Sequence, residues 1–437
     1  MKRFVFFVLM TCCGLSAFAV PLPEGTDARI TEVRQNDGKI VYVRLKEATV
    51  LNTPLGPLEA VEEVLFHENG SIKEFQPAVA GEYGSPVGNL SYTTSPISFY
   101  ESGAVEEIEL AKPTDITGSV GRIKVAAKTI TFYDKWIPSS VELAEDCQIK
   151  LKAGVVSARG GYRMFFHENG TIQSFTVSKS EPLNSSIGKI YPQEGSVMIL
   201  HPNGSLSTVS PEDICMVTVD ETLYFTKARS PIAFRSGGEV LRFSAETQDF
   251  AFGKFKFTLE NGSTEMFVYA DGSVFFPAPG YVHLAGLDYR RHCNGLFVAP
   301  HHNQLIYWEE SFNDISVYNY SYSPEGKLVS KSLNMNVLQC NSDTMKYFEN
   351  PPFTFDQEGS ITSYLGFERR KNPETNSSYN HPVIVRVATR TTQPEIMPPS
   401  PVPNKPEPPI RPRPRPPAKP EPTIPTPRPV QPPVHER

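Results

Sequence analysis

The residues best suited to binding a metal ion are histidines that recur in one sequence motif. His67, His167 and His201 each lie three residues before a glycine of that motif. If every copy of the motif adds four strands to one sheet, His167 and His201 lie about 19 Å apart, at about 4.8 Å per strand. Zinc ligands must all come within about 2 Å of the ion. We therefore interpret these histidines as polar turn residues and predict no metal site from them.

A denser group of metal-binding residue types comprises His292, Cys293, His301 and His302. Its spacing matches no zinc motif, and histidines of a surface loop are the simpler interpretation. The sequence contains no G-x-S-x-G, H-E-x-x-H, Walker or G-x-G-x-x-G motif, so we predict no nucleophile elbow, zinc helix or phosphate loop. We expect a protein that is not an enzyme, with no catalytic residues, no cofactor and no metal.

The motif is an internal repeat with a period of about 33 residues. Each copy has an apolar residue, a phenylalanine or similar residue, a short polar stretch, a glycine and a second apolar residue. The structural turn glycines are Gly38, Gly70, Gly103, Gly170, Gly204, Gly238 and Gly272. The one double interval contains a degenerate copy, in which Phe132 keeps the aromatic position and Trp136 replaces the glycine.

A second turn follows 18 residues after several of these turn positions, including that of Trp136. Its glycines are Gly56, Gly88, Gly121, Gly154 and Gly188. Asn-Gly, Asp-Gly and Glu-Gly between alternating apolar and polar residues are typical of β-hairpins, so two turns predict about four short strands per period. A row of equivalent residues should fill the core: Phe66, Phe99, Phe132, Phe166, Phe234 and Val268.

The predicted fold class is all-β, an elongated antiparallel β-hairpin repeat that forms a meander or solenoid. A continuous meander of this length should coil, because open twisted sheets rarely exceed about ten strands. The alternative is a β-propeller with four strands in each blade. We favour the elongated form, since common blades need about 40 to 45 residues.

The motif resembles the MORN repeat, and most closely its bacterial variant in secreted proteins and antitoxin-component-type proteins. The residues that carry the resemblance are Phe66 to Ile72, Phe99 to Val105 and Phe166 to Ile172, and it extends from about Ile30 to Phe276. The period is longer than that of ordinary MORN units. The resemblance implies a stack of β-hairpins that binds partners or membrane surfaces, and it supplies no catalytic residues.

The N-terminus has the features of a secretory signal peptide over residues 1–19. Lys2 and Arg3 precede an apolar run, and Ala17 to Ala19 provide an A-x-A end. Lipidation at Cys12 or Cys13 is the alternative. The signal predicts an exported protein in the periplasm, on the cell surface or secreted, and no later stretch is long enough for a transmembrane segment.

We expect a repeat domain at 20–295, degenerate β repeats at 296–392 and a disordered basic Pro-rich tail at 393–437. Of the 41 prolines, 19 lie in the last 44 residues, a composition typical of extended polyproline II. The net charge of −6 becomes about −8 without the signal peptide. The tail has a net charge of about +3, so the rest of the mature chain is near −11. An acidic body excludes non-specific nucleic-acid binding as an expected role.

Four cysteines follow the signal, which is too few for a disulfide scaffold. Cys147 and Cys215 hold equivalent positions two periods apart, so a regular stack separates them. Cys293 and Cys340 lie where the repeat fades and could meet in a disulfide. We expect a cell-envelope scaffold whose tail is a tether and whose partner is an unknown protein or peptidoglycan. The alternative is an envelope glycan-binding or hydrolytic enzyme on a propeller.

Overall fold

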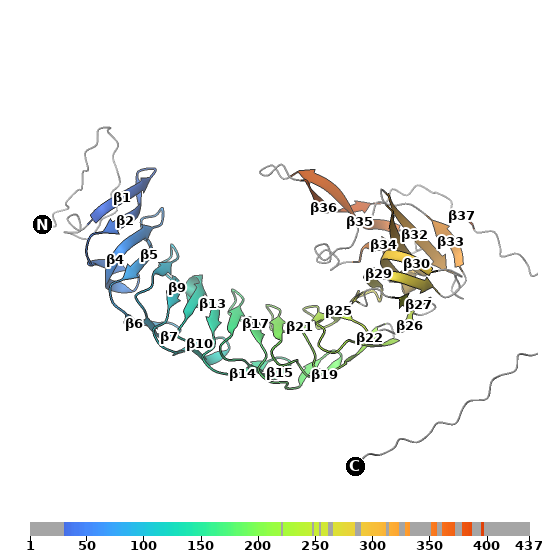
Figure 1. The fold of residues 1–437 in the computed structure, drawn as a ribbon, viewed down its shortest axis with the longest axis horizontal. Helices are drawn as coiled ribbons and strands as arrows, with labels where there is room; N and C mark the ends of the chain where they lie inside the picture. Colours follow the sequence, from blue (N-terminus) through green and yellow to red (C-terminus); the bar gives the residue numbers. More distant parts are fainter. Residues whose placement is uncertain are drawn as a thin grey trace, which may run out of the picture. The chain divides into compact units, whose positions relative to one another are not determined.

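The computed structural model describes residues 30–219, 222–246, 249–252, 255–260, 265–284, 290–311, 314–322, 328–332, 351–355, 361–371, 378–386 and 395–396. Within them, nearly all regular structure is β-strand (Figure 1), which confirms the all-β prediction. The exceptions are two short 3-10 turns, η2 (Asp134–Trp136) and η3 (Pro300–His302). The predicted signal peptide, Cys340 and nearly all of the predicted tail lie outside the described residues.

The first hairpin of each repeat belongs to one long antiparallel meander, the main sheet. Each hairpin pairs edge to edge with the next one, through β5–β8, β9–β12, β13–β16, β17–β20, β21–β24 and β25–β28. These hairpins are β1 (Ile30–Asn36) with β2 (Lys39–Leu45), β4 (Gly56–Phe66) with β5 (Ile72–Pro77), β8 (Ile97–Phe99) with β9 (Val105–Glu109), β12 (Thr129–Tyr133) with β13 (Ile137–Glu142), β16 (Arg163–Phe166) with β17 (Ile172–Thr176), β20 (Val197–Leu200) with β21 (Leu206–Val209), β24 (Ile232–Phe234) with β25 (Val240–Ser244), and β28 (Glu265–Val268) with β29 (Val274–Leu284). This order confirms the predicted meander and does not support the propeller.

The second hairpin of each repeat forms a separate two-stranded ladder. These hairpins are β6 (Gly81–Ser85) with β7 (Gly88–Tyr92), β10 (Thr114–Gly118) with β11 (Gly121–Val125), β14 (Cys147–Leu151) with β15 (Gly154–Ala158), β18 (Leu183–Ser185) with β19 (Gly188–Ile190), and β22 (Met216–Val219) with β23 (Thr222–Phe225). The main sheet therefore gains two strands per repeat. Each repeat has the four short strands that were predicted, but only two of them join the main sheet. The expectation of 19 Å between equivalent residues was therefore wrong, and the spacing is about 10 Å.

The hydrophobic core lies between the main sheet and the second hairpins. Side chains alternate in both, so that Met164 and Phe166 of β16 are buried while Arg163 and Phe165 are exposed. Inward residues of the second hairpins, such as Ile116 and Val156, belong to the same buried cluster. The predicted row lies in this core: Phe66, Phe99, Phe132, Phe166 and Phe234 are buried, and Val268 is partly buried.

Long strands join the two layers at both ends of the repeats. The first half of β4 pairs with β3 (Thr49–Thr53) and its second half pairs with β2, with a bend at Glu62, whose φ is +60°. At the other end, β29 pairs with β28 and then with β27 (Phe255–Glu260), itself paired with β26 (Asp249–Phe252). Gly280, with φ +74°, lies at the bend of β29. These strands cap the core, as a repeat array requires.

Longer strands continue the main sheet after β29. They are β30 (Arg290–Ala299), β31 (Gln304–Ser311), β32 (Asp314–Tyr322) and β33 (Leu328–Ser332). A three-stranded sheet follows, made of β34 (Phe353–Phe355), β35 (Ile361–Lys371) and β36 (Ser378–Arg386), and β37 is Glu395–Ile396. Among the residues that the structure describes, none forms a helix with the length and apolar character that crossing a bilayer requires.

Candidate binding surfaces

The seven predicted turn glycines all lie in tight turns of the first hairpins, with φ between +77° and +98°. In one such turn the Gly170 amide donates to the carbonyl of His167 at 2.8 Å, and Asn169 Oδ1 accepts from the Thr171 amide at 3.0 Å. An L-residue with a side chain is strained in this conformation by about 1–2 kcal/mol. These glycines therefore shape the repeat and contribute no chemistry of their own.

The residue that follows the core row connects each repeat to the next. Its side chain hydrogen-bonds to a backbone carbonyl one repeat further on, at 2.7 to 3.0 Å. That carbonyl belongs to the residue at the core-row position, which is Leu200 in the repeat of Gly204. The six pairs are His67 with Phe99, Tyr100 with Phe132, Tyr133 with Phe166, His167 with Leu200, His201 with Phe234, and Arg235 with Val268. We call this series the inter-repeat ladder.

The inter-repeat ladder explains the recurring histidines without a metal ion. A net contribution of about 1 kcal/mol is usual for such a hydrogen bond. The sequence carries a signal for it: His, Tyr and Arg share one offset in the repeat, and all carry a donor at the end of the side chain. The histidines thus hydrogen-bond one repeat to the next.

The thiols and the other residues of metal-binding type that the structure describes lie on several different elements. Burial raises the pKa of the thiols of Cys147 and Cys215, which lie in different second hairpins. Cys293 is buried in β30, and the ring of His302 stacks on Phe355 with centroids 4.7 Å apart. Within the described part of the chain, no three His, Cys, Asp or Glu residues are grouped so that they could hold a metal ion.

The outward face of the main sheet carries one row of directly paired residues, which we call the outer row. From β4 to β30 it comprises Leu65, Glu74, Ser98, Glu107, Thr131, Ser140, Phe165, Ser174, Ile199, Thr208, Ala233, Arg242, Phe267, Phe275 and Phe297. After Leu65 its first members are acidic or hydroxyl residues, and its last three are phenylalanines. The outer row therefore changes from polar to aromatic along the sheet, while the core row stays apolar.

The β22–β23 hairpin has an exposed apolar surface. Met216 is 58% exposed and pairs with Phe225, which is 41% exposed, and Leu223 on the same face is 47% exposed. Ile214 and Tyr191 are 52% and 45% exposed, and the Glu212 amide donates to the Tyr191 carbonyl at 2.7 Å. We call these five residues the β22–β23 patch.

Equivalent outward positions on other second hairpins are mostly polar, although Val155 of β15, which corresponds to Leu223, is 45% exposed. On β10–β11, Asp115 pairs with Lys124, and on β18–β19, Asn184 pairs with Lys189. Apolar side chains that gather on an exposed face often mark an interaction site. The β22–β23 patch is therefore our candidate binding surface.

Comparison with known proteins assigns no family. No family model matches the sequence, and no curated protein is significantly similar to it. The function is therefore inferred from the surfaces of the two layers.

Proposed function

We propose that this protein is an exported cell-envelope scaffold that is not an enzyme and binds a protein or an envelope polymer through its hairpin faces. The basic Pro-rich segment at 393–437 is a tether in this proposal. Repeat proteins commonly present extended surfaces of this kind to their partners.

The observation that carries the proposal is the contrast between inner and outer positions of one repeat. Turn glycines, core row and inter-repeat ladder recur from copy to copy, whereas outward residues vary from Glu107 to Ile199 in the outer row. Recurrence is what stacking requires, and variation is what recognition by different side chains requires. The alternative, an envelope glycan-binding or hydrolytic enzyme, depends on a propeller that the strand order does not support.

The test uses the full chain as bait in an envelope extract, with a variant of the β22–β23 patch. Leu223→Ser with Phe225→Ser should lower retention of the partner at least tenfold, because burial of these exposed side chains drives the association. The matched control is Asn184→Ser with Lys189→Ser, on the equivalent face of β18–β19, which should retain the partner as the unaltered chain does. Equal retention by both variants would contradict the proposed surface.

Export is tested separately by fractionation of cells that express the full chain. The A-x-A end at Ala17 to Ala19 predicts a mature protein in the periplasm, at the surface or in the medium. An uncleaved chain in the cytoplasm would contradict the proposed location.

A further inference from the structure

The degenerate repeat departs from the backbone rule that the other copies follow. Its first-hairpin turn is the 3-10 turn η2, where Lys135 has φ +66° and Trp136, in the glycine position, has φ +63°. Two consecutive residues with side chains in this region are unusual. Such strain persists only where the surroundings hold it, and it often marks a functional place.

In other repeats, the glycine turn closes against the tip of an earlier second hairpin. A Cβ added to Gly103 would lie 3.5 Å from Pro54 Cβ, which is ordinary contact. Ser119 Oγ donates to the Gly170 carbonyl, and Ser186 Oγ donates to the Gly238 carbonyl at 2.6 Å. The two tips are thus in direct contact, and a Cβ on Gly238 would meet nothing within 4 Å.

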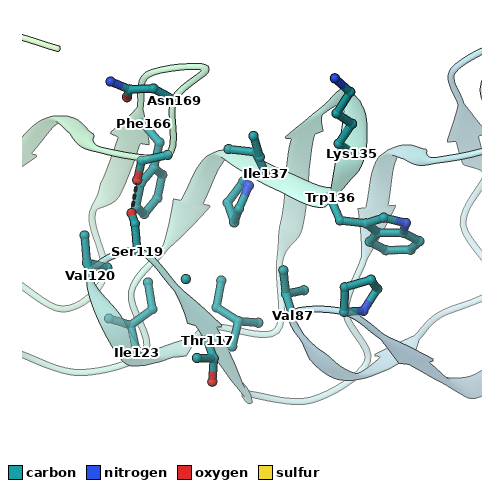
Figure 2. A pocket seen from close by; sticks show the side chains of 15 residues that line it. Val87, Thr117, Ser119, Val120, Ile123, Lys135, Trp136, Ile137, Phe166 and Asn169 are labelled. Atoms are coloured by element: carbon teal, nitrogen blue, oxygen red, sulfur yellow. Dashed lines mark hydrogen bonds between the residues drawn. The ribbon is translucent and has the colours of Figure 1, made fainter.

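Trp136 places an indole where the other turns have no side chain. Its ring stacks on Tyr83, with centroids 5.7 Å apart, and meets the edge of Phe132 at 5.5 Å. A cavity of about 300 Å³ lies beside it, between this turn and the tips of the β6–β7 and β10–β11 hairpins. Figure 2 shows the residues that line it, among them Val87, Val120, Ile123, Ile137 and Phe166. We call this space the Trp136 cavity.

Most side chains that line the Trp136 cavity are apolar. The polar ones are Thr117, Ser119, Lys135 and Asn169, and two of these four already have hydrogen-bond partners. Ser119 Oγ donates to the Gly170 carbonyl, and the Asn169 side-chain amide donates to the Pro202 carbonyl at 2.8 Å. A guest with hydrogen-bonding groups would have to compete with these bonds, whereas an apolar guest would not. An enclosed apolar cavity of about 150 Å³ binds benzene. The Trp136 cavity is larger and is partly open to solvent.

We propose that the Trp136 cavity is a binding site for one uncharged aromatic ring. The ring is either a free monocyclic compound or the side chain of a phenylalanine in a peptide. This site is separate from the β22–β23 patch, so either proposal can fail without the other.

The test is a titration of the full chain with toluene, observed through its tryptophan indole NMR signals. The chain has two tryptophans, Trp136 and Trp308, and Trp308 is fully buried in a second core cluster. Trp136→Phe assigns the signals. We expect a saturable shift of the Trp136 signal and none of the Trp308 signal. No saturable shift, or equal shifts of both signals, would overturn the proposal.

A filled-cavity variant makes the test specific. Val120→Phe places a ring inside the Trp136 cavity and should abolish the toluene shift. The matched control is Ile187→Phe, at the same turn position of β18–β19, which faces a repeat closed by Gly238; it should bind toluene as the unaltered chain does. If Val120→Phe does not fold, Trp136→Gly restores the common turn, and binding is then followed by line broadening of the toluene signals. Retained binding in the variant that folds would overturn the proposal.

N-acetyl-phenylalanine amide distinguishes the two sources of the ring. Binding of toluene alone would assign the site to free ring compounds, and binding of both probes would assign it to peptide side chains as well. Binding of neither probe would overturn the proposal.

Discussion

The outer row passes through two regions of the main sheet that differ in what lies over them. Near its start, Glu107 is exposed and Thr131 is half-buried. Near its end, Phe275 and Phe297 are fully buried: Trp308 of β31 stacks on Phe275 at 5.5 Å, and Phe353 of the separate sheet packs on Phe297 at 5.5 Å. At these two places the outward residues are thus polar where they remain open and apolar where other side chains cover them, although Ser140 between them is polar and buried.

This difference gives meaning to the apolar residues that remain open. Phe165 is 40% exposed and Ile199 38% exposed, and both belong to the outer row between the two regions. The β22–β23 patch has the same character on the second layer. Both surfaces have the composition of a covered face but are exposed in the part of the chain that the structure describes, which supports the proposal that they bind a partner.

The largest expected effect compares the two ends of the outer row. Phe275→Ala should lower the free energy of unfolding by about 3–5 kcal/mol, because it opens a cavity in a buried aromatic cluster. Glu107→Ala, at an exposed position of the same row, should change it by less than about 0.5 kcal/mol. Urea unfolding of both variants provides the measurement. Similar losses would show that the two regions do not differ as described.

Close packing at the covered end gives the next effect. A Cβ on Gly295 would lie 1.9 Å from Trp308 Cζ2, whereas a Cβ on Gly118 would meet nothing within 4 Å. Gly295→Ala should therefore cost about 1–3 kcal/mol through overpacking, and Gly118→Ala should cost less. Thermal unfolding checks both, and an unchanged melting temperature for Gly295→Ala would argue against the stacked position of Trp308.

The hairpins of the main sheet depend on the inter-repeat ladder for their register. Tyr133→Phe removes only the hydroxyl that donates to the Phe166 carbonyl at 3.0 Å, and should cost about 0.5–1.5 kcal/mol. Tyr162→Phe is the matched control at an exposed tyrosine. Equal unfolding midpoints for the two variants would show that this hydrogen bond does not stabilise the fold.

The smallest expected effect is a pH dependence that arises at Asp146, just before the second-hairpin strand β14. The Ser178 hydroxyl, and then the Gly160 amide, donate to Asp146 and lower the pKa of its carboxyl group. The stabilisation is therefore present above the unfolded pKa of about 3.9, and is lost as the pH falls through the lower folded pKa. Ser178→Ala should reduce this loss between neutral and acid pH, as followed by urea unfolding. An unchanged pH profile would count against the hydrogen bond.

The sequence predicts the parts of the fold that local chemistry determines. Turns such as Asn169-Gly170 and the alternation around Phe166 specify hairpins and their inward side, so the period, the turns and the core row follow from residue types. The division into two layers does not, because both hairpins of a repeat have the same local pattern. Whether β5 pairs with β6 or with β8 depends on which arrangement buries both inward faces together.

The candidate sites were less predictable than the fold. Trp136 was visible in the sequence as a missing glycine, but the cavity beside it depends on hairpin tips that only the folded chain brings near it. The β22–β23 patch has ordinary strand composition, and its outward residues become apparent only when the inward side is known. The inter-repeat ladder could be predicted only if the main sheet was known to gain two strands per repeat.

A distance across two repeats tests the two-layer arrangement most directly. Glu106 in β9 and Gln173 in β17 hold equivalent positions and are four strands apart through β12, β13 and β16. Spin labels attached through a ketone-bearing amino acid at both positions leave the native cysteines unlabelled. The two-layer arrangement predicts a separation of about 19 Å between the labelled backbone positions. A separation of about 38 Å, as in a sheet with four strands per repeat, would contradict it.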